Sequence, residues 1–172
     1  MIPEKLINFR VYKGGNQYMG IANVDLPQLQ FMTTSIKGAG ISGEIDSVVM
    51  GHLQSMQAKL NFRTPTPENL TLAAPVAHEL DFRGSMDYYD NAEGKHKVVP
   101  LKVWIKGKPK TIPLGKLEPG ATMDNEIELE VLAVGVFIDG KESVYIDKLN
   151  YIFRVDDTDY LQEARVAEGM EG

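Results

Sequence analysis

Hydrophobic and charged residues alternate most regularly at the start of segment 125–155. From Glu126 to Val131, glutamate fills every second position, while Ile127, Leu129 and Val131 fill the positions between. Successive side chains of a strand point to opposite faces, so this alternation indicates a strand with one polar and one apolar face. We therefore predict a strand whose glutamates face solvent and whose aliphatic residues face a core.

The second half of the same predicted strand is apolar on both faces. Leu132–Ile138 contains no polar side chain, and Asp139-Gly140 then provides the residues of a tight hairpin turn. The return strand, Ser143–Val155, is again rich in β-branched and aromatic residues. Since a strand that is apolar on both faces needs cover on both, we expect this hairpin to complete its burial against other copies of the chain.

Shorter strand patterns occupy most of the remaining chain. The segment Met56–Arg63 alternates as clearly as residues 126–131, with Gln57, Lys59 and Asn61 on its polar face. The other predicted strands are Leu6–Lys13, Gln17–Val24, Gln28–Ile36, Glu79–Tyr89, Lys97–Lys106 and Lys110–Leu114. A turn at Gly14-Gly15-Asn16 joins the first two of these into a hairpin, whereas the glycine-rich residues 38–50 are predicted to be irregular.

Two short helices interrupt the strands. Thr66 is a suitable N-cap, Pro67 suits the first helical position, and Pro75 ends the helix. A second helix is predicted over Tyr160–Ala167, within segment 157–168. Residues 1–172 then form a single, mainly β domain, an antiparallel β-sandwich or partly closed barrel with one or two short helices.

Composition supports a globular protein with an uneven charge distribution. The chain is 43% hydrophobic and 24% charged, has no cysteine, and carries a net charge of -6. Residues 95–116 contain seven lysines and no acid, whereas residues 117–172 contain fourteen acids and four basic residues. The acidic segment argues against nucleic-acid binding over most of the surface. No run approaches the length of a membrane span, so we expect no membrane partner and synthesis in the cytoplasm.

No motif predicts catalysis, a cofactor or a metal site. Gly38-Ala39-Gly40-Ile41-Ser42-Gly43 fits a dinucleotide-binding pattern in its letters, but the residues that follow make a poor helix start. His52, His78 and His96 are far apart in sequence, and we expect them at the surface or its rim. The sequence has no nucleophile-elbow or zinc-protease motif. We expect a protein that is not an enzyme, with no catalytic residues and no cofactor.

An ordered set of short motifs resembles one known family. They run from Met1-Ile2-Pro3 through the hairpin Val11–Ile21, Leu26-Pro27-Gln28-Leu29 and Lys37-Gly38-Ala39-Gly40, to Asp139-Gly140-Lys141-Glu142, Tyr145-Ile146-Asp147, Asn150 and the segment Val155 to Gln162. Together they resemble the major tail tube proteins of contractile phage tails and R-type pyocin-like particles. The resemblance covers nearly the whole chain, although no single motif in it is specific.

The resemblance implies a structural role. Members of this family form hexameric rings that stack into a hollow tube inside a sheath, with a lumen lined by four strands from each subunit. The expected partners are other copies of the chain, the tail sheath protein, baseplate and tail terminator proteins, a tape measure protein in the lumen, and DNA in passage. The expected location is the tail of a virion or of a phage-tail-like bacteriocin.

Three groups of residues are candidates for assembly. The resemblance implies that residues 37–50 are an extended loop that reaches a neighbouring subunit, with contacts from Lys37, Gly38, Ala39, Gly40, Ile41, Ser42, Gly43, Glu44, Ile45 and Asp46. The polar strand faces make Glu126, Glu128, Glu130, Gln57, Lys59 and Asn61 candidates for the lumen. The apolar hairpin makes Val134, Val136, Ile138, Tyr145, Leu149 and Tyr151 candidates for an inter-subunit sheet.

Two other interpretations remain open. The ring protein of a type VI secretion system shares the tube architecture, although the terminal motifs favour the phage-type tail. A β-sandwich that binds a sugar or peptide would need a concave face with clustered aromatic residues, for which Tyr88, Tyr89 and Trp104 are the candidates.

Overall fold

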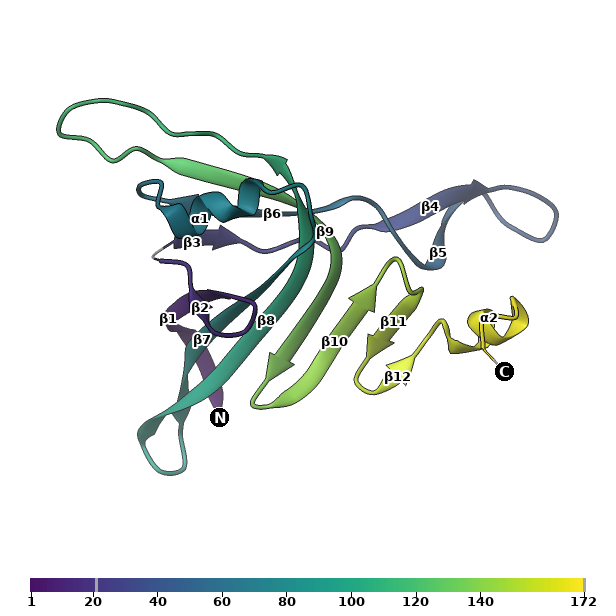
Figure 1. Cartoon of the computed structure of the whole chain (residues 1–172). Helices are drawn as coiled ribbons and strands as arrows, with labels where there is room; N and C mark the ends of the chain where they lie inside the picture. The colour runs from purple at the N-terminus through teal and green to yellow at the C-terminus, as the bar shows by residue number, and fades with distance from the viewer. Residues whose placement is uncertain (21, 172) are drawn as a thin grey trace.

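Antiparallel strands make up most of the molecule (Figure 1). The structure is a computed structural model that describes residues 1–20 and 22–171. Its strands are β1 (Ile2–Lys13), β2 (Gln17–Tyr18), β3 (Ala22–Asp25), β4 (Phe31–Ile36), β5 (Ile45–Leu53), β6 (Met56–Phe62), β7 (His78–Asp90), β8 (Lys95–Thr111), β9 (Asn125–Ile138), β10 (Lys141–Asp147), β11 (Ile152–Val155) and β12 (Thr158–Asp159). The helical elements are α1 (Pro67–Leu70), the 3-10 turn η1 (Thr71–Ala73) and α2 (Gln162–Ala167). The predicted mainly β fold is confirmed.

One large sheet forms the body, in the order β12-β11-β10-β9-β8-β7-β1-β2. The long strands β8 and β9 curve through its middle (Figure 1). The first half of β9 also pairs with β6, which in turn pairs with β3. Because β9 belongs to both parts of this sheet, one core joins them. Its fully buried residues include Met56, Ala58, Leu60, Leu80, Ile105, Ile127, Leu129 and Val131.

A β-bulge at Leu132 changes which side chains in the second half of β9 face the core. Gly107 pairs with Val131, whereas the preceding residue of β8, Lys106, pairs with Ala133, so Leu132 is the extra residue. A bulge of one residue reverses the alternation beyond it. Val134 and Val136 consequently join the core side, next to Ile105 and Val103.

The N-terminal region differs from its predicted hairpin. β1 begins at Ile2 rather than Leu6, and β2 is only two residues long. At Gly20 the backbone has φ +106, a conformation that favours glycine, and β3 then pairs with β6 instead of β1. Ile21, the last residue of the predicted hairpin, lies outside the described residues. The predicted strand Gln17–Val24 is therefore divided, because its second part pairs with β6, which is distant along the chain.

The cap of the first predicted helix is confirmed. The Asn69 backbone N–H donates to Thr66 Oγ1 at 3.1 Å, and the Thr66 N–H donates to Asn69 Oδ1 at 3.0 Å. The helical segment ends at Ala73, before Pro75. The second helix begins at Gln162, two residues later than predicted.

Other predicted strand boundaries were also wrong, and the return strand predicted over Ser143–Val155 divides into β10 and β11. β8 continues to Thr111, so the separate strand predicted over Lys110–Leu114 does not form. Residues 112–124 instead make a loop that projects from the body (Figure 1). Segment 38–50 is not irregular throughout, because β5 begins at Ile45.

Candidate assembly surfaces

Strands β4 and β5 form an arm that projects from the body as a separate two-stranded sheet (Figure 1). Ile36 pairs with Ile45, and Ser35 pairs with Asp46. The predicted contact loop therefore divides in two. Residues 37–44 connect the strands at the tip of the arm, while Ile45 and Asp46 belong to β5. Sequence reasoning missed this hairpin because glycines dominate the segment before β5.

The arm exposes large apolar side chains. Val48 is 55% exposed and Met50 is 58% exposed. Met32, Ile36 and Ile45 are also exposed. Ile36 and Ile45 lie on one face of this two-stranded sheet, and Val48 and Met50 lie on the other. Exposed apolar side chains of this kind are typical of a protein interaction site. The arm is thus a candidate surface for contact with a partner.

The tip of the arm combines charge with conformational freedom. Lys37 Nζ lies 4.0 Å from Glu44 Oε2, and the Ser35 hydroxyl donates to the Glu44 carboxylate. Gly38, Gly40 and Gly43 have positive φ angles, which glycine adopts without strain. These contacts close the tip across its two strands.

The base of the arm is held by the C-terminal segment. Gly51 has φ +70, and a Cβ placed there would lie 2.5 Å from Leu161 Cδ2. The Phe31 and Phe153 rings are 5.7 Å apart, and His52 Nε2 lies 3.1 Å from the Tyr151 hydroxyl. The arm therefore leaves the body in a fixed direction. Glycine at position 51 is the only sequence signal of this close approach, and the prediction did not use it.

The six lumen candidates share one polar face. Glu126, Glu128 and Glu130 of β9 pair directly with Asn61, Lys59 and Gln57 of β6, in that order. Lys59 Nζ lies 3.4 Å from Glu128 Oε1, and the Ser55 hydroxyl donates to the Glu130 carboxylate at 2.7 Å. The opposite face of both strands is core. The prediction of alternation is confirmed, and the structure adds the cross-strand pairing.

The six candidates for an inter-subunit sheet lie in different environments. Val134 is buried in the core of its own chain and Val136 packs against it. Ile138 is exposed at the end of β9. Leu149 and Tyr151 lie in the connection between β10 and β11; Leu149 is exposed, whereas Tyr151 packs on the core. The set does not form one continuous surface on the subunit.

Tyr145, the sixth member, belongs to an aromatic stack that the sequence did not predict. The Trp104 and Tyr145 rings are 5.9 Å apart and nearly parallel, and both residues pair with Gly135. A Cβ at Gly135 would lie 3.3 Å from the Tyr145 ring, so glycine leaves room for this packing. The Arg154 guanidinium lies over Tyr145 and donates to Glu142 at 2.7 Å, which lowers the pKa of Glu142. Burial raises the pKa of Tyr145.

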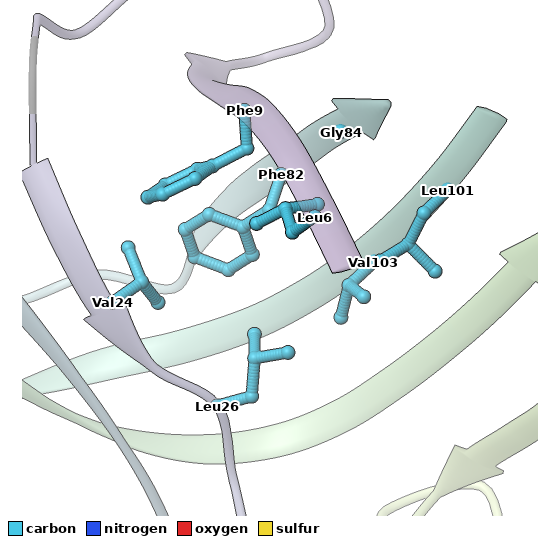
Figure 2. A pocket seen from close by; sticks show the side chains of 8 residues that line it. All are labelled: Leu6, Phe9, Val24, Leu26, Phe82, Gly84, Leu101 and Val103. Atoms are coloured by element: carbon cyan, nitrogen blue, oxygen red, sulfur yellow. The ribbon is translucent and has the colours of Figure 1, made fainter. Parts of the chain in front are cut away.

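An apolar cavity of about 80 Å³ lies where β1, β7 and β8 approach β3 (Figure 2). Figure 2 shows the side chains that line it, Leu6, Phe9, Val24, Leu26, Phe82, Leu101 and Val103, together with the backbone of Gly84. The lining offers no acid, base or nucleophile. Tyr88, Tyr89 and Trp104, the aromatic candidates for a ligand-binding module, do not line it.

The predicted positions of the histidines were partly wrong. His96 is exposed and His52 is half-buried, but His78 is buried, with Nε2 3.0 Å from the Ala74 carbonyl oxygen. The turn after η1 covers His78, which spacing in the sequence cannot reveal.

The outer edge of β1 is open. β2 reaches only Tyr12 and Lys13, and no other strand of the described residues pairs with that side of β1. Ile2, Leu6 and Ile7 expose large side chains along it. An unpaired strand edge with apolar side chains is able to accept another strand.

Comparison with known proteins assigns the chain to a family. Within residues 1–20 and 22–171, neither helix has the length and apolar character required to cross a membrane. The family model described as "Phage tail tube protein FII" matches residues 3–169. The tail tube protein of Escherichia phage P2 is 30% identical over 174 residues, covering 98% of this chain and 99% of the relative. The chain therefore belongs to the phage tail tube protein FII family, and it is a structural, non-enzymatic subunit of a virion tail that assembles with copies of itself.

Proposed function

We propose that the chain forms hexameric rings, and that these rings stack into the inner tube of a contractile phage tail or phage-tail-like bacteriocin. The observation that carries this proposal is the arm, whose exposed apolar residues find no cover in their own chain. A second copy of the chain is the occupant that a self-assembling tail subunit makes available. The arm, with Lys37–Asp46 at its end, contacts a neighbouring subunit, and the open edge of β1 contributes to lateral pairing.

The polar face of β6 and β9 is proposed to line the lumen. A channel that conducts DNA must not retain it, and phosphate is held by lysine and arginine. Glu126, Glu128 and Glu130 repel phosphate, while Lys59 is paired with Glu128 and Lys108 of β8 lies opposite Glu130. This surface is therefore suited to DNA or a tape measure protein in passage.

The remaining partners follow from this place in the particle. A sheath protein surrounds the tube, a baseplate starts it and a tail terminator ends it, and assembly takes place in the host cytoplasm. The outer surface of the ring then meets the sheath, while the arm serves contacts between tube subunits.

Negative-stain electron microscopy over a range of concentrations tests the arrangement, with a matched pair of variants. Val48 in the arm and Val76 in the body are each 55% exposed. We expect rings or tubes with sixfold end views from the wild type and from Val76→Asp. Val48→Asp should stay folded and unassembled, because it places a charge in the arm contact. Tubes formed normally by Val48→Asp, or end views of another symmetry, would contradict the proposal.

A cysteine at Glu126 tests the lumen, since the natural chain has none. In assembled tubes of Glu126→Cys, a maleimide carrying a large polymer should not react, whereas it should label the dissociated subunit fully. Equal labelling of tubes and subunits would show that this face is outside the lumen.

A further inference from the structure

Three strands bring Glu4, Asp87 and His96 together. Glu4 lies in β1, Asp87 in β7 and His96 in β8. His96 Nδ1 is 2.9 Å from Asp87 Oδ1 and 3.8 Å from Glu4 Oε2, and one ligand atom from each residue lies within 4.8 Å of the others. Sequence reasoning did not find this cluster, because Glu4 is distant along the chain from Asp87 and His96.

A β-bulge positions Glu4. β1 and β7 shift register between Pro3 and Lys5, so Glu4 has no direct partner in β7. Bulges re-aim side chains, and this one places the Glu4 carboxylate beside its neighbours' ligand atoms. The cluster therefore depends on a specific irregularity in the edge strand.

Asp87 is a largely buried carboxylate that is hydrogen-bonded to the His96 imidazole and lies opposite Lys5 of β1. Its side chain is only 12% exposed, and among the described residues its sole ion-pair partner is His96. Lys97, the nearest lysine along β8, is bound to Asp90 at 2.9 Å and to Glu93 at 3.7 Å. Buried carboxylates are normally paired or bound to a metal, and here one imidazole faces the two carboxylates of Asp87 and Glu4.

We propose that Glu4, Asp87 and His96 bind a divalent transition-metal ion of the Zn²⁺ class. One imidazole nitrogen and two carboxylate oxygens are ligands that Zn²⁺ accepts, whereas Mg²⁺ and Ca²⁺ prefer oxygen alone. Tetrahedral Zn²⁺ with bonds of about 2.0–2.2 Å sets neighbouring ligand atoms roughly 3.3–3.5 Å apart. The distances of 2.9 and 3.8 Å lie on either side of that range, and the exposed Glu4 side chain can move to adjust them.

Three protein ligands leave the fourth position open to water. The ion would join the edge strand β1 to the hairpin of β7 and β8. Binding of the ion would order residues 3–6 within a single subunit. The site therefore does not depend on how subunits assemble.

Titration of the metal-free, unassembled full-length subunit with Zn²⁺, followed calorimetrically, tests the site. The chain has no cysteine and three histidines, so background binding is low. We expect one ion per subunit, with affinity reduced about tenfold or more in His96→Gln and in Glu4→Gln. His52→Gln is the matched control, because His52 contacts Tyr151 rather than carboxylates. No saturable binding, or equal affinity in the His96 and His52 variants, would overturn the proposal.

Hydrogen exchange gives a second readout that does not depend on the affinity measurement. Zn²⁺ should slow amide exchange at residues 4–6 in the wild type and leave exchange in Glu4→Gln unchanged. Glu4→Gln and His96→Gln both alter exposed side chains, so we expect both variants to fold. Protection elsewhere in the chain, with none at residues 4–6, would place the ion at another site and refute this one.

Discussion

Two antiparallel strand pairs of the molecule, β6 with β9 and β4 with β5, differ in how far their own subunit covers their side chains. β6 and β9 bury one face in the core, and their polar face is satisfied by cross-strand contacts such as Lys59 with Glu128. The arm has a regular ladder, yet large apolar residues such as Val48 remain exposed along it. The body is therefore stabilised within one subunit, whereas we propose that the arm is stabilised fully only in an assembly.

The same isoleucine-to-alanine change in the two regions should give the largest contrast. Ile127 is fully buried in β9, and Ile45 is 53% exposed in the arm. Ile127→Ala should lower the free energy of unfolding by about 2–5 kcal/mol, since it removes buried methyl groups and leaves a cavity. Ile45→Ala should change it by less than about 0.5 kcal/mol.

Urea denaturation of unassembled subunits measures both effects. In assembly the order should reverse, with Ile45→Ala raising the concentration needed for tube formation more than Ile127→Ala does. Comparable losses of stability in the two variants would show that the arm packs within its own subunit.

The base of the arm should be more sensitive than its tip. Gly51→Ala places a Cβ against Leu161 and strains a residue with φ +70, so we expect a loss of roughly 1–3 kcal/mol. Gly40→Ala also strains a positive φ, but nothing lies within 4 Å of its Cβ, and the loss should be about 1 kcal/mol. Thermal unfolding compares the two variants. Equal decreases in melting temperature would show that the contact with Leu161 does not add to the loss at position 51.

The C-terminal segment that holds the arm should loosen in acid. Arg165 donates to Asp159 Oδ2 at 2.6 Å, and this hydrogen bond lowers the pKa of Asp159. A carboxyl whose pKa is lower in the folded state contributes stability above its unfolded pKa of about 3.9, and that contribution is lost as pH falls through the folded pKa.

Limited proteolysis of the C-terminal segment at a series of pH values measures this effect. We expect cleavage near α2 to increase below about pH 4 in the wild type. Asp159→Asn should show faster cleavage at neutral pH and little further change in acid. A wild-type profile with no change in that range would show that the ion pair does not hold the segment.

Sequence reasoning succeeded where a strand carries its own alternation of polar and apolar residues. It failed where the structure depends on contacts between segments that are distant along the chain. The faces of Glu126–Val131 and Met56–Phe62 were predictable because each strand carries its own alternation. The bulge at Leu132 was not, since it depends on the register of β8. β5 was hidden by the glycines before it, and the contacts of Gly51 and His96 depend on residues at the far end of the chain or on another strand.

The smallest effect should come from the ion pair on the polar face. Lys59 and Glu128 are opposed across β6 and β9 at 3.4 Å, but the Lys59 side chain is 43% exposed to solvent. Solvent screens such a pair, so a double-mutant cycle of Lys59→Gln and Glu128→Gln should give a coupling energy below about 1 kcal/mol, smaller still in high salt. If this face lines a narrow lumen, the same cycle should instead affect function: Glu128→Gln leaves Lys59 uncompensated and should slow DNA release from assembled particles, whereas the double variant restores neutrality and the wild-type rate. Release unaffected by Glu128→Gln would mean that DNA does not pass this face, whatever its contribution to stability.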